Sequence, residues 1–309
     1  MAEKTVEQYY LPPPKVGRWE GFRTFLWNSE THQFLGRTGA SWAKILLFYV
    51  LFYASLTGFF FAMLAIFYQT IDLDIPKWQL DESLIGSNPG LGFRPMPPEE
   101  NVESTLIWYN QKDDNWKYWT NQLDVFLKEY TEENPNRVHC DFGEEAPPGK
   151  ICDVDITSFH NCTSATEFGY ARAQPCIFLK LNKIFNWRPT YYNATSGVAE
   201  GMPKELKSLV HNVTNADSRK DYVWVSCEGE NPADVENMGD LEYIPAQGFA
   251  SYYFPFRNTK GYLSPLVAIR FVRPKTGVLI NIECKAWAKN IFHDRAERRG
   301  SVHFELMVD

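Results

Sequence analysis

The stretch of sequence that decides the fold is ILLFYVLFYASLTGFFFAMLAIFY, residues 45–68. Its 24 residues include no charged residue, no Asn, no Gln and no Pro. As an α-helix it would be roughly 36 Å long, which exceeds the hydrocarbon thickness of a bilayer, about 30 Å. A helix of this length buried in a soluble protein would carry a polar stripe, but here only Ser55, Thr57 and tyrosine hydroxyls are polar. We therefore predict one transmembrane helix.

A secretory signal peptide is the alternative interpretation of an apolar stretch. Such a peptide starts near the N-terminus, is shorter and ends at a small-residue cleavage site. Here 44 residues precede the stretch, and the following IFYQTIDLDIP has no A-x-A pattern. The helix thus separates a tail, residues 1–44, from residues 69–309, which are numerous enough for one sizeable core.

The charges that flank the span predict its orientation. Arg37 and Lys44 precede it, whereas the residues that follow are mainly acidic: Asp72, Asp74, Asp81 and Glu82, opposed only by Lys77. Because basic residues favour the cytoplasmic side, we expect a type II single-pass protein with a cytoplasmic N-terminus and an extracellular C-terminal part.

The net charge of −7 and the lack of a patch of basic residues interleaved with aromatics argue against nucleic-acid binding.

Cysteines and glycosylation sequons test this orientation independently. All six cysteines follow the span: Cys140, Cys152, Cys162, Cys176, Cys227 and Cys284. An even number on one side indicates disulfides in an oxidising compartment, although six cysteines leave fifteen pairings open. No pair has the C-x2-4-C spacing of a zinc site, and only His139 beside Cys140 and His160 near Cys162 keep a metal site as a minor alternative. Three N-x-[ST] sequons, acceptors of N-glycans in secreted domains, also follow the span: at Asn161, Asn193 and Asn212.

The remaining segments differ in character. Residues 1–17 contain three consecutive prolines and predict a flexible tail. Residues 18–44 are rich in aromatics, which suit either the inner membrane interface or packing on a partner's cytoplasmic face: Trp19, Phe22, Phe25, Leu26, Trp27, Phe34 and Trp42. Residues 69–103 contain many Pro and Gly, so we expect an extended stalk and no core element there.

Residues 104–309 predict a disulfide-bonded domain built mainly of strands. After a strand at 104–109, Asp114 is expected to cap the one substantial helix outside the membrane, which ends at Asn134-Pro135 and whose aromatic stripe indicates core packing. Further strands are predicted at 176–181, 222–227, 266–272, 278–284 and 302–308. In the strand at 278–284, Val278, Ile280, Ile282 and Cys284 share one face. Short alternating strands in a secreted setting favour an antiparallel β-sandwich.

No catalytic motif is found, since the sequence lacks G-x-S-x-G, a Gly-rich phosphate loop, H-E-x-x-H and C-x-x-C. An ectoenzyme built from residues distant in sequence remains a minor alternative.

The span itself suggests association with another helix. Ala54, Gly58 and Ala62 are spaced by four and share one side of the helix, where their small side chains allow close approach of another helix. Tyr49 and Tyr53, also four apart, are predicted to lie on a face next to this one.

The chain resembles the beta subunits of sodium/potassium-transporting ATPases. The resemblance is carried by a W-N-x5-F-x-G-R-T-x-x-S-W run, which is matched by Trp27, Asn28, Phe34, Gly36, Arg37, Thr38, Ser41 and Trp42. It continues through PCIFLKLNKI at 175–184, YLSPLVA at 262–268 and IECKA at 282–286, and it covers nearly the whole chain in order. The gastric proton/potassium pump beta subunit has the same plan, but the F-L-G-R-T run and only three sequons favour the sodium pump form.

The resemblance implies a non-catalytic subunit in the plasma membrane, without a cofactor, that folds, escorts and tunes a catalytic alpha subunit, with a small single-span subunit as a further partner. It implies the disulfides Cys140–Cys152, Cys162–Cys176 and Cys227–Cys284, and an immunoglobulin-like sandwich that rests on the pump. It also implies contacts with the alpha subunit from Tyr49 and Tyr53 and from two loop segments, represented by Tyr252, Tyr253, Phe254 and Tyr262. Ser55 stands where vertebrate members often have a cysteine. An adhesion ectodomain that acts independently of a pump is the alternative function.

Overall fold

The computed structural model describes residues 17–101, 104–144, 146–194, 197–294, 297 and 299–309. The chain divides into two units, Met1–Asp72 and Leu73–Asp309, and each is described by itself. Apart from its last residue, the predicted flexible tail lies outside the described residues.

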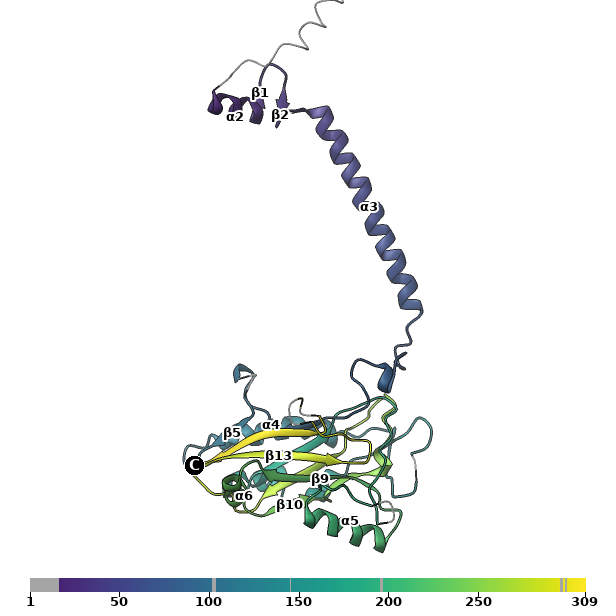
Figure 1. Ribbon diagram of the computed structural model, residues 1–309, viewed down its shortest axis with the longest axis vertical. Coiled ribbons are helices and arrows are strands. Elements are labelled where there is room, and N and C mark those ends of the chain that lie inside the picture. Colours follow the sequence, from purple (N-terminus) through teal and green to yellow (C-terminus); the bar gives the residue numbers. More distant parts are fainter. Residues whose placement is uncertain (1–16, 102–103, 145, 195–196, 295–296, 298) are drawn as a thin grey trace, which may run out of the picture. The chain divides into compact units, whose positions relative to one another are not determined.

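The first unit is dominated by α3 (Gly39–Gln69), a continuous helix of 31 residues (Figure 1). It contains the predicted span and is longer at both ends. None of its residues is buried by the rest of the chain. In the described part of the chain, no other helix is long and apolar enough to cross a membrane. The prediction of one such helix is confirmed.

A small folded piece precedes α3. It consists of a helix and a three-stranded antiparallel sheet: α2 (Arg18–Leu26), β1 (Trp27–Asn28), β2 (Gln33–Phe34) and β3 (Arg37–Thr38). Gly36, between β2 and β3, has a φ of 73°, a backbone conformation that glycine adopts without steric cost. The aromatic content of the segment did not predict that it folds into a helix and a small sheet.

The second unit contains two sheets that pack face to face. The four-stranded sheet has the order β10 (Leu241–Ile244), β12 (Leu266–Phe271), β8 (Cys176–Leu181), β4 (Leu91–Arg94). The five-stranded sheet has the order β11 (Gly248–Ala250), β9 (Tyr222–Gly229), β13 (Leu279–Trp287), β14 (Ser301–Val308), β5 (Leu106–Tyr109). Among the described residues a short pair, β6 (Arg137–Val138) and β7 (Ile151–Cys152), lies apart from both sheets.

The inner faces of the two sheets share one hydrophobic core. The ring of Phe304 in β14 lies 5.1 Å from that of Phe93 in β4 and 6.4 Å from that of Phe271 in β12. In β13, Ile280, Ile282 and the disulfide-bonded cysteine at 284 are fully buried, whereas the residues between them are not. The predicted alternation is therefore confirmed, and this face of β13 points into the core.

Two predictions about the strands are wrong. The stalk does contain a core element, because β4 pairs with β8 and buries Leu91 and Phe93. The domain is also not wholly antiparallel, since β5 runs parallel to β14 and β6 runs parallel to β7. A four-residue strand in a Pro- and Gly-rich stretch gives little sequence signal, and periodicity says nothing about the direction of a partner strand.

The predicted helix exists as α4 (Trp116–Thr131), whose core-facing residues are Trp116, Trp119, Leu123, Leu127 and Tyr130. Asp114 does not cap it. Asp114 has a φ of 56° and forms an ion pair with Lys117, and the residue before the first turn is Asn115. Because the left-handed conformation at Asp114 turns the chain one residue before the helix begins, its carboxylate is not at the cap position.

The helix α4 is not the only substantial one in this unit. The prediction missed α5 (Lys204–Ala216) and α6 (Pro232–Met238). The side of α5 that carries Leu206 and Val210 packs on Trp224 and Trp287, which together with Met202 form a second, smaller core. The described residues also include short 3-10 helices: Leu80–Glu82, Glu99–Asn101, Ile156–Phe159, Ser164–Arg172 and Ser251–Tyr253.

Three disulfides form within the second unit. Their pairing is the one that the resemblance implies: Cys140–Cys152, Cys162–Cys176 and Cys227–Cys284. Cys227 and Cys284 lie directly opposite each other on the adjacent strands β9 and β13. In antibody domains the hallmark disulfide instead joins the two sheets. The packed sheets agree with a sandwich, but this bond gives no support to the immunoglobulin-like form, which stays a prediction.

Replacing Cys227 and Cys284 together by alanine should lower the free energy of unfolding by about 4 kcal/mol, because the bond closes a loop of 57 residues. The bond between Cys140 and Cys152 closes a loop of only 12 residues, so the matched double replacement of these two cysteines should cost about 3 kcal/mol. Urea unfolding of the full-length chain in detergent measures both. A smaller loss for the first variant than for the second would contradict this ranking.

Candidate functional site

The first candidate surface is the exposed side of α3. The rings of Tyr49 and Tyr53 stack on each other with centroids 6.1 Å apart, and both side chains are exposed. No other described part of the chain covers Gly58, because a Cβ atom placed there would meet nothing within 4 Å. The helix therefore offers a tyrosine pair and a groove of small residues to its surroundings.

These two features do not lie on neighbouring faces, so that prediction is wrong. Tyr49 and Gly58 are nine residues apart on a continuous helix, which is about two and a half turns at 3.6 residues per turn. The tyrosine pair and the groove of Ala54, Gly58 and Ala62 consequently lie on opposite sides of α3. One partner helix cannot contact both.

The second candidate surface is an aromatic loop, residues 251–262, in the second unit. Its rings are packed in pairs: Tyr252 on Tyr253 at 4.5 Å and Phe256 on Tyr262 at 4.7 Å. The ring of Phe254 lies 5.6 Å from that of Trp187. All five loop rings are half-buried, so each presents an edge or face to solvent while the rest of the ring is held.

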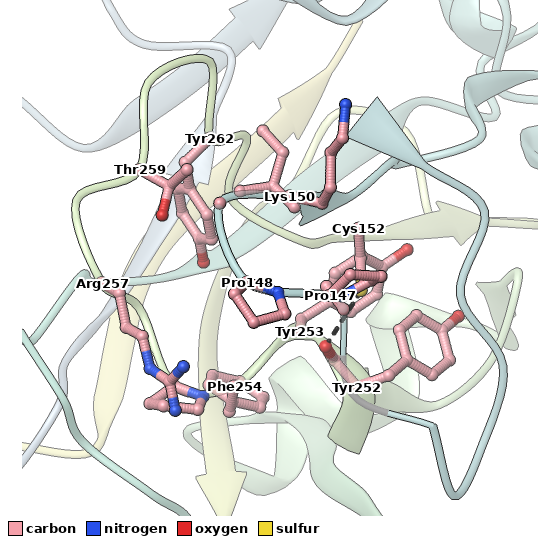
Figure 2. Close-up of a pocket in the computed structure, with 14 residues that line it drawn as sticks. Pro147, Pro148, Lys150, Cys152, Tyr252, Tyr253, Phe254, Arg257, Thr259 and Tyr262 are labelled. Carbon is pink, nitrogen blue, oxygen red and sulfur yellow. Dashed lines mark hydrogen bonds between the residues drawn. The ribbon is translucent and has the colours of Figure 1, made fainter. Parts of the chain in front are cut away.

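The first disulfide loop supports the aromatic loop. The Cys152 sulfur lies 3.1 Å from the carbonyl oxygen of Tyr252 (Figure 2), and because this sulfur is disulfide-bonded it has no proton to donate. The Tyr253 hydroxyl donates a hydrogen bond of 3.3 Å to the carbonyl oxygen of Asp153. The ring of Phe142 packs on that of Tyr252 at 5.2 Å. The position of the aromatic loop thus depends on residues 140–153.

Between the two loops lies a small cavity of about 70 Å³. Figure 2 shows the side chains around it, which come from residues 146–152 and 252–262. Pockets that bind drug-sized ligands have volumes of about 300–1,000 Å³. The cavity is therefore too small for such a ligand, and we consider the two loops as a candidate contact surface.

A positive charge adjoins the aromatic rings. The Lys183 ammonium lies 5.1 Å from the centroid of the Tyr262 ring and 5.6 Å from that of Phe256, within the range of a cation–π interaction. Burial raises the pKa of Tyr252, Tyr253 and Tyr262 above the ordinary value of a phenol. These tyrosines are neutral at physiological pH; the Tyr253 hydroxyl already donates to Asp153, so Tyr252 and Tyr262 are the ones considered as donors to a partner.

Sequence reasoning found the aromatic loop only through the family resemblance, and it missed the residues that hold the loop in place. Phe142, Lys183 and Trp187 lie far from it in sequence, and no periodicity connects them to it. Leu263, Ser264 and Leu266, which follow Tyr262, are buried in the domain.

The three predicted sequons have different surroundings. Asn161 and Asn212 are exposed, whereas Asn193 is half-buried and hydrogen-bonds Asp221. Thr214, the hydroxyl residue of the Asn212 sequon, is buried in α5, donates to the Val210 carbonyl at 2.6 Å and accepts from the Ala194 amide at 2.9 Å. Thr195 of the Asn193 sequon lies outside the described residues.

His139 and His160, the two histidines considered for a metal, belong to no metal-binding group. Within the described ranges, no three His, Cys, Asp or Glu side chains come together in an arrangement that could hold a metal ion.

The buried tyrosines predict a loss of stability at high pH. Burial raises the pKa of Tyr222 to about 12, whereas an unfolded tyrosine has a pKa of about 10. Above pH 10 the unfolded chain therefore loses protons that the folded chain keeps, and the free energy of unfolding falls as pH rises. Tyrosinate absorbance and unfolding should rise together above about pH 10. Complete tyrosine titration near pH 10 with the fold retained would contradict this.

Comparison with known proteins agrees with these features. A family model described as the sodium/potassium ATPase beta chain matches residues 13–304. The sodium/potassium-transporting ATPase subunit beta-2 of Drosophila melanogaster is 49% identical, over 98% of this chain and 96% of its own length. Subunit beta-1 of the same organism is 42% identical, over 96% and 95%. Human subunit beta-2 is 33% identical, over 94% of each chain.

The match extends through α3, both sheets and all six cysteines, so it does not rest on a single motif. The family resemblance found in the sequence is confirmed. This chain belongs to the sodium/potassium ATPase beta-chain family.

Proposed function

We propose that this protein is the non-catalytic beta subunit of a sodium/potassium-transporting ATPase. In this role it binds the catalytic alpha subunit, helps it fold and reach the plasma membrane, and tunes its affinity for cations. The observation that carries the proposal is α3, an apolar helix with every side uncovered by its own chain, in a chain that belongs to this family.

A type II orientation fits the proposal. The residues around the start of α3 are basic and those after its end are acidic, which favours a cytoplasmic N-terminus. The second unit carries three disulfides and two exposed sequon asparagines, as an extracellular, glycosylated domain would. The matching family model and the similar relatives, all described as sodium/potassium ATPase beta subunits, support the sodium pump form over the proton/potassium form.

The tyrosine side of α3 and the aromatic loop are the proposed contacts with the alpha subunit. Tuning would follow from binding linkage: contacts that are stronger in one state of the pump than in another stabilise that state by the difference in free energy. A difference of about 1.4 kcal/mol shifts an affinity tenfold. The beta subunit needs no catalytic residues for this effect.

The opposite side of α3 remains free when the tyrosines face the alpha subunit. The groove of Ala54, Gly58 and Ala62 allows a second helix to approach the backbone closely. A small single-span regulatory subunit would supply such a helix.

Co-purification tests the proposed partner directly. The full-length chain, extracted from its native membrane with a mild detergent, should carry a P-type ATPase alpha subunit identified by mass spectrometry. Recovery of the intact chain without any such subunit would contradict the proposal.

Replacing Tyr49 and Tyr53 together by alanine should reduce the amount of alpha subunit recovered or shift the apparent potassium affinity of the pump severalfold. The matched control replaces Leu47 and Leu51, which have the same spacing, are exposed and lie on the opposite side of the helix from the tyrosine pair. Phenylalanine at positions 49 and 53 separates the contribution of the hydroxyls from that of the rings. Equal effects of the Tyr49/Tyr53 and Leu47/Leu51 alanine variants would remove a specific tyrosine contact from the mechanism.

A further inference from the structure

We infer that α2 and the small sheet β1–β3 form an anchor on the lipid surface beside the N-terminal end of α3. The aromatic side of α2 would insert among the headgroups, and the basic residues around it would bind anionic lipids. This inference rests on the proposed membrane span of α3.

One side of α2 is apolar and uncovered. Trp19, Phe22 and Leu26, at positions i, i+3 and i+7, share this side and have exposed fractions of 79%, 53% and 39%. Thr24 lies on the other side, where its hydroxyl donates to the carbonyl oxygen of Glu20. A helix of nine residues is about 14 Å long and cannot cross a bilayer. Its apolar side therefore suits the interface.

Backbone and side-chain contacts join α2 to the beginning of α3. The Leu35 amide donates to the carbonyl oxygen of Leu26 at 3.2 Å, and the Trp42 indole in α3 donates to the carbonyl oxygen of Phe34 in β2 at 2.9 Å. A Cβ atom at Gly36 would lie 3.6 Å from the Phe25 ring, so the ring packs on the backbone of this turn. The strand β3 ends at Thr38, directly before α3.

Because of these contacts, α2 is held close to the first turns of α3 and not on a free tether. If α3 spans the bilayer, its first turns lie at one membrane surface. The exposed apolar side of α2 then lies close to that membrane surface.

The charges favour an anionic lipid surface as the occupant. Four exposed basic side chains lie in α2, in β3 and at the start of α3: Arg18, Arg23, Arg37 and Lys44. They outnumber the acidic residues of positions 17–44, Glu20 and Glu30. Trp and Phe side chains next to Arg are typical of interfacial helices, which bind through apolar insertion together with attraction to anionic lipids.

The experiment uses single cysteines, because no described cysteine is free. Phe22→Cys places a spin label on the apolar side of α2, Thr24→Cys is the matched control on the other side, and Leu56→Cys reports from the middle of α3. Each full-length variant, in the complex in which it purifies, is placed in nanodiscs with or without phosphatidylserine. Accessibility to oxygen, which concentrates in lipid, and to a water-soluble nickel chelate is then measured.

The inference predicts that the label at position 22 is severalfold less accessible to the nickel chelate than the label at position 24, and more accessible to oxygen. This difference should shrink when phosphatidylserine is omitted. Equal nickel accessibility at the two positions would overturn the inference, and so would protection of position 22 from both reagents, which indicates that a protein covers it. A label at position 56 that contacts water would instead contradict the proposed span.

Discussion

The structure depends on one constraint, which is that α3 exposes an apolar surface that its own chain does not cover. A helix of 31 residues with no buried side chain has to be surrounded by lipid or by other helices, because water would oppose the exposure of so much apolar area. The tyrosine pair and the small-residue groove stand out from the aliphatic and phenylalanine side chains on the rest of this helix, and they lie on opposite sides. The helix can therefore serve as an anchor and as a binding element for more than one neighbour.

In the second unit, the aromatic rings of the loop 251–262 are held in place while staying half-exposed at the surface. The loop 251–262 is held by contacts of Tyr252 and Tyr253 with residues 152–153 and by the ring of Phe142. A surface that is ordered before a partner arrives loses less conformational entropy on binding. If the loop contacts a partner as proposed, the disulfide Cys140–Cys152 contributes to the contact surface as well as to stability.

Much of the fold could be predicted from local sequence patterns. The buried face of β13 follows from alternating apolar residues, and the core-facing side of α4 follows from their helical spacing. The helix α5 was missed because its polar residues obscured the spacing of Leu206 and Val210. The strand β4 was missed because Gly and Pro dominate its surroundings, although Phe93 is as buried as many central residues.

The sequence by itself determined that this protein has one apolar helix long enough to span a membrane, that its cysteines and sequons lie on one side of this helix, and which family it resembles. These features depend on composition and order along the chain. Only the tertiary structure decided that β5 runs parallel to β14, that Phe93 meets Phe304 and that the first disulfide loop supports the aromatic loop. Such features depend on contacts between residues far apart in the chain, and local periodicity reports whether a residue is buried but not against which residue it packs.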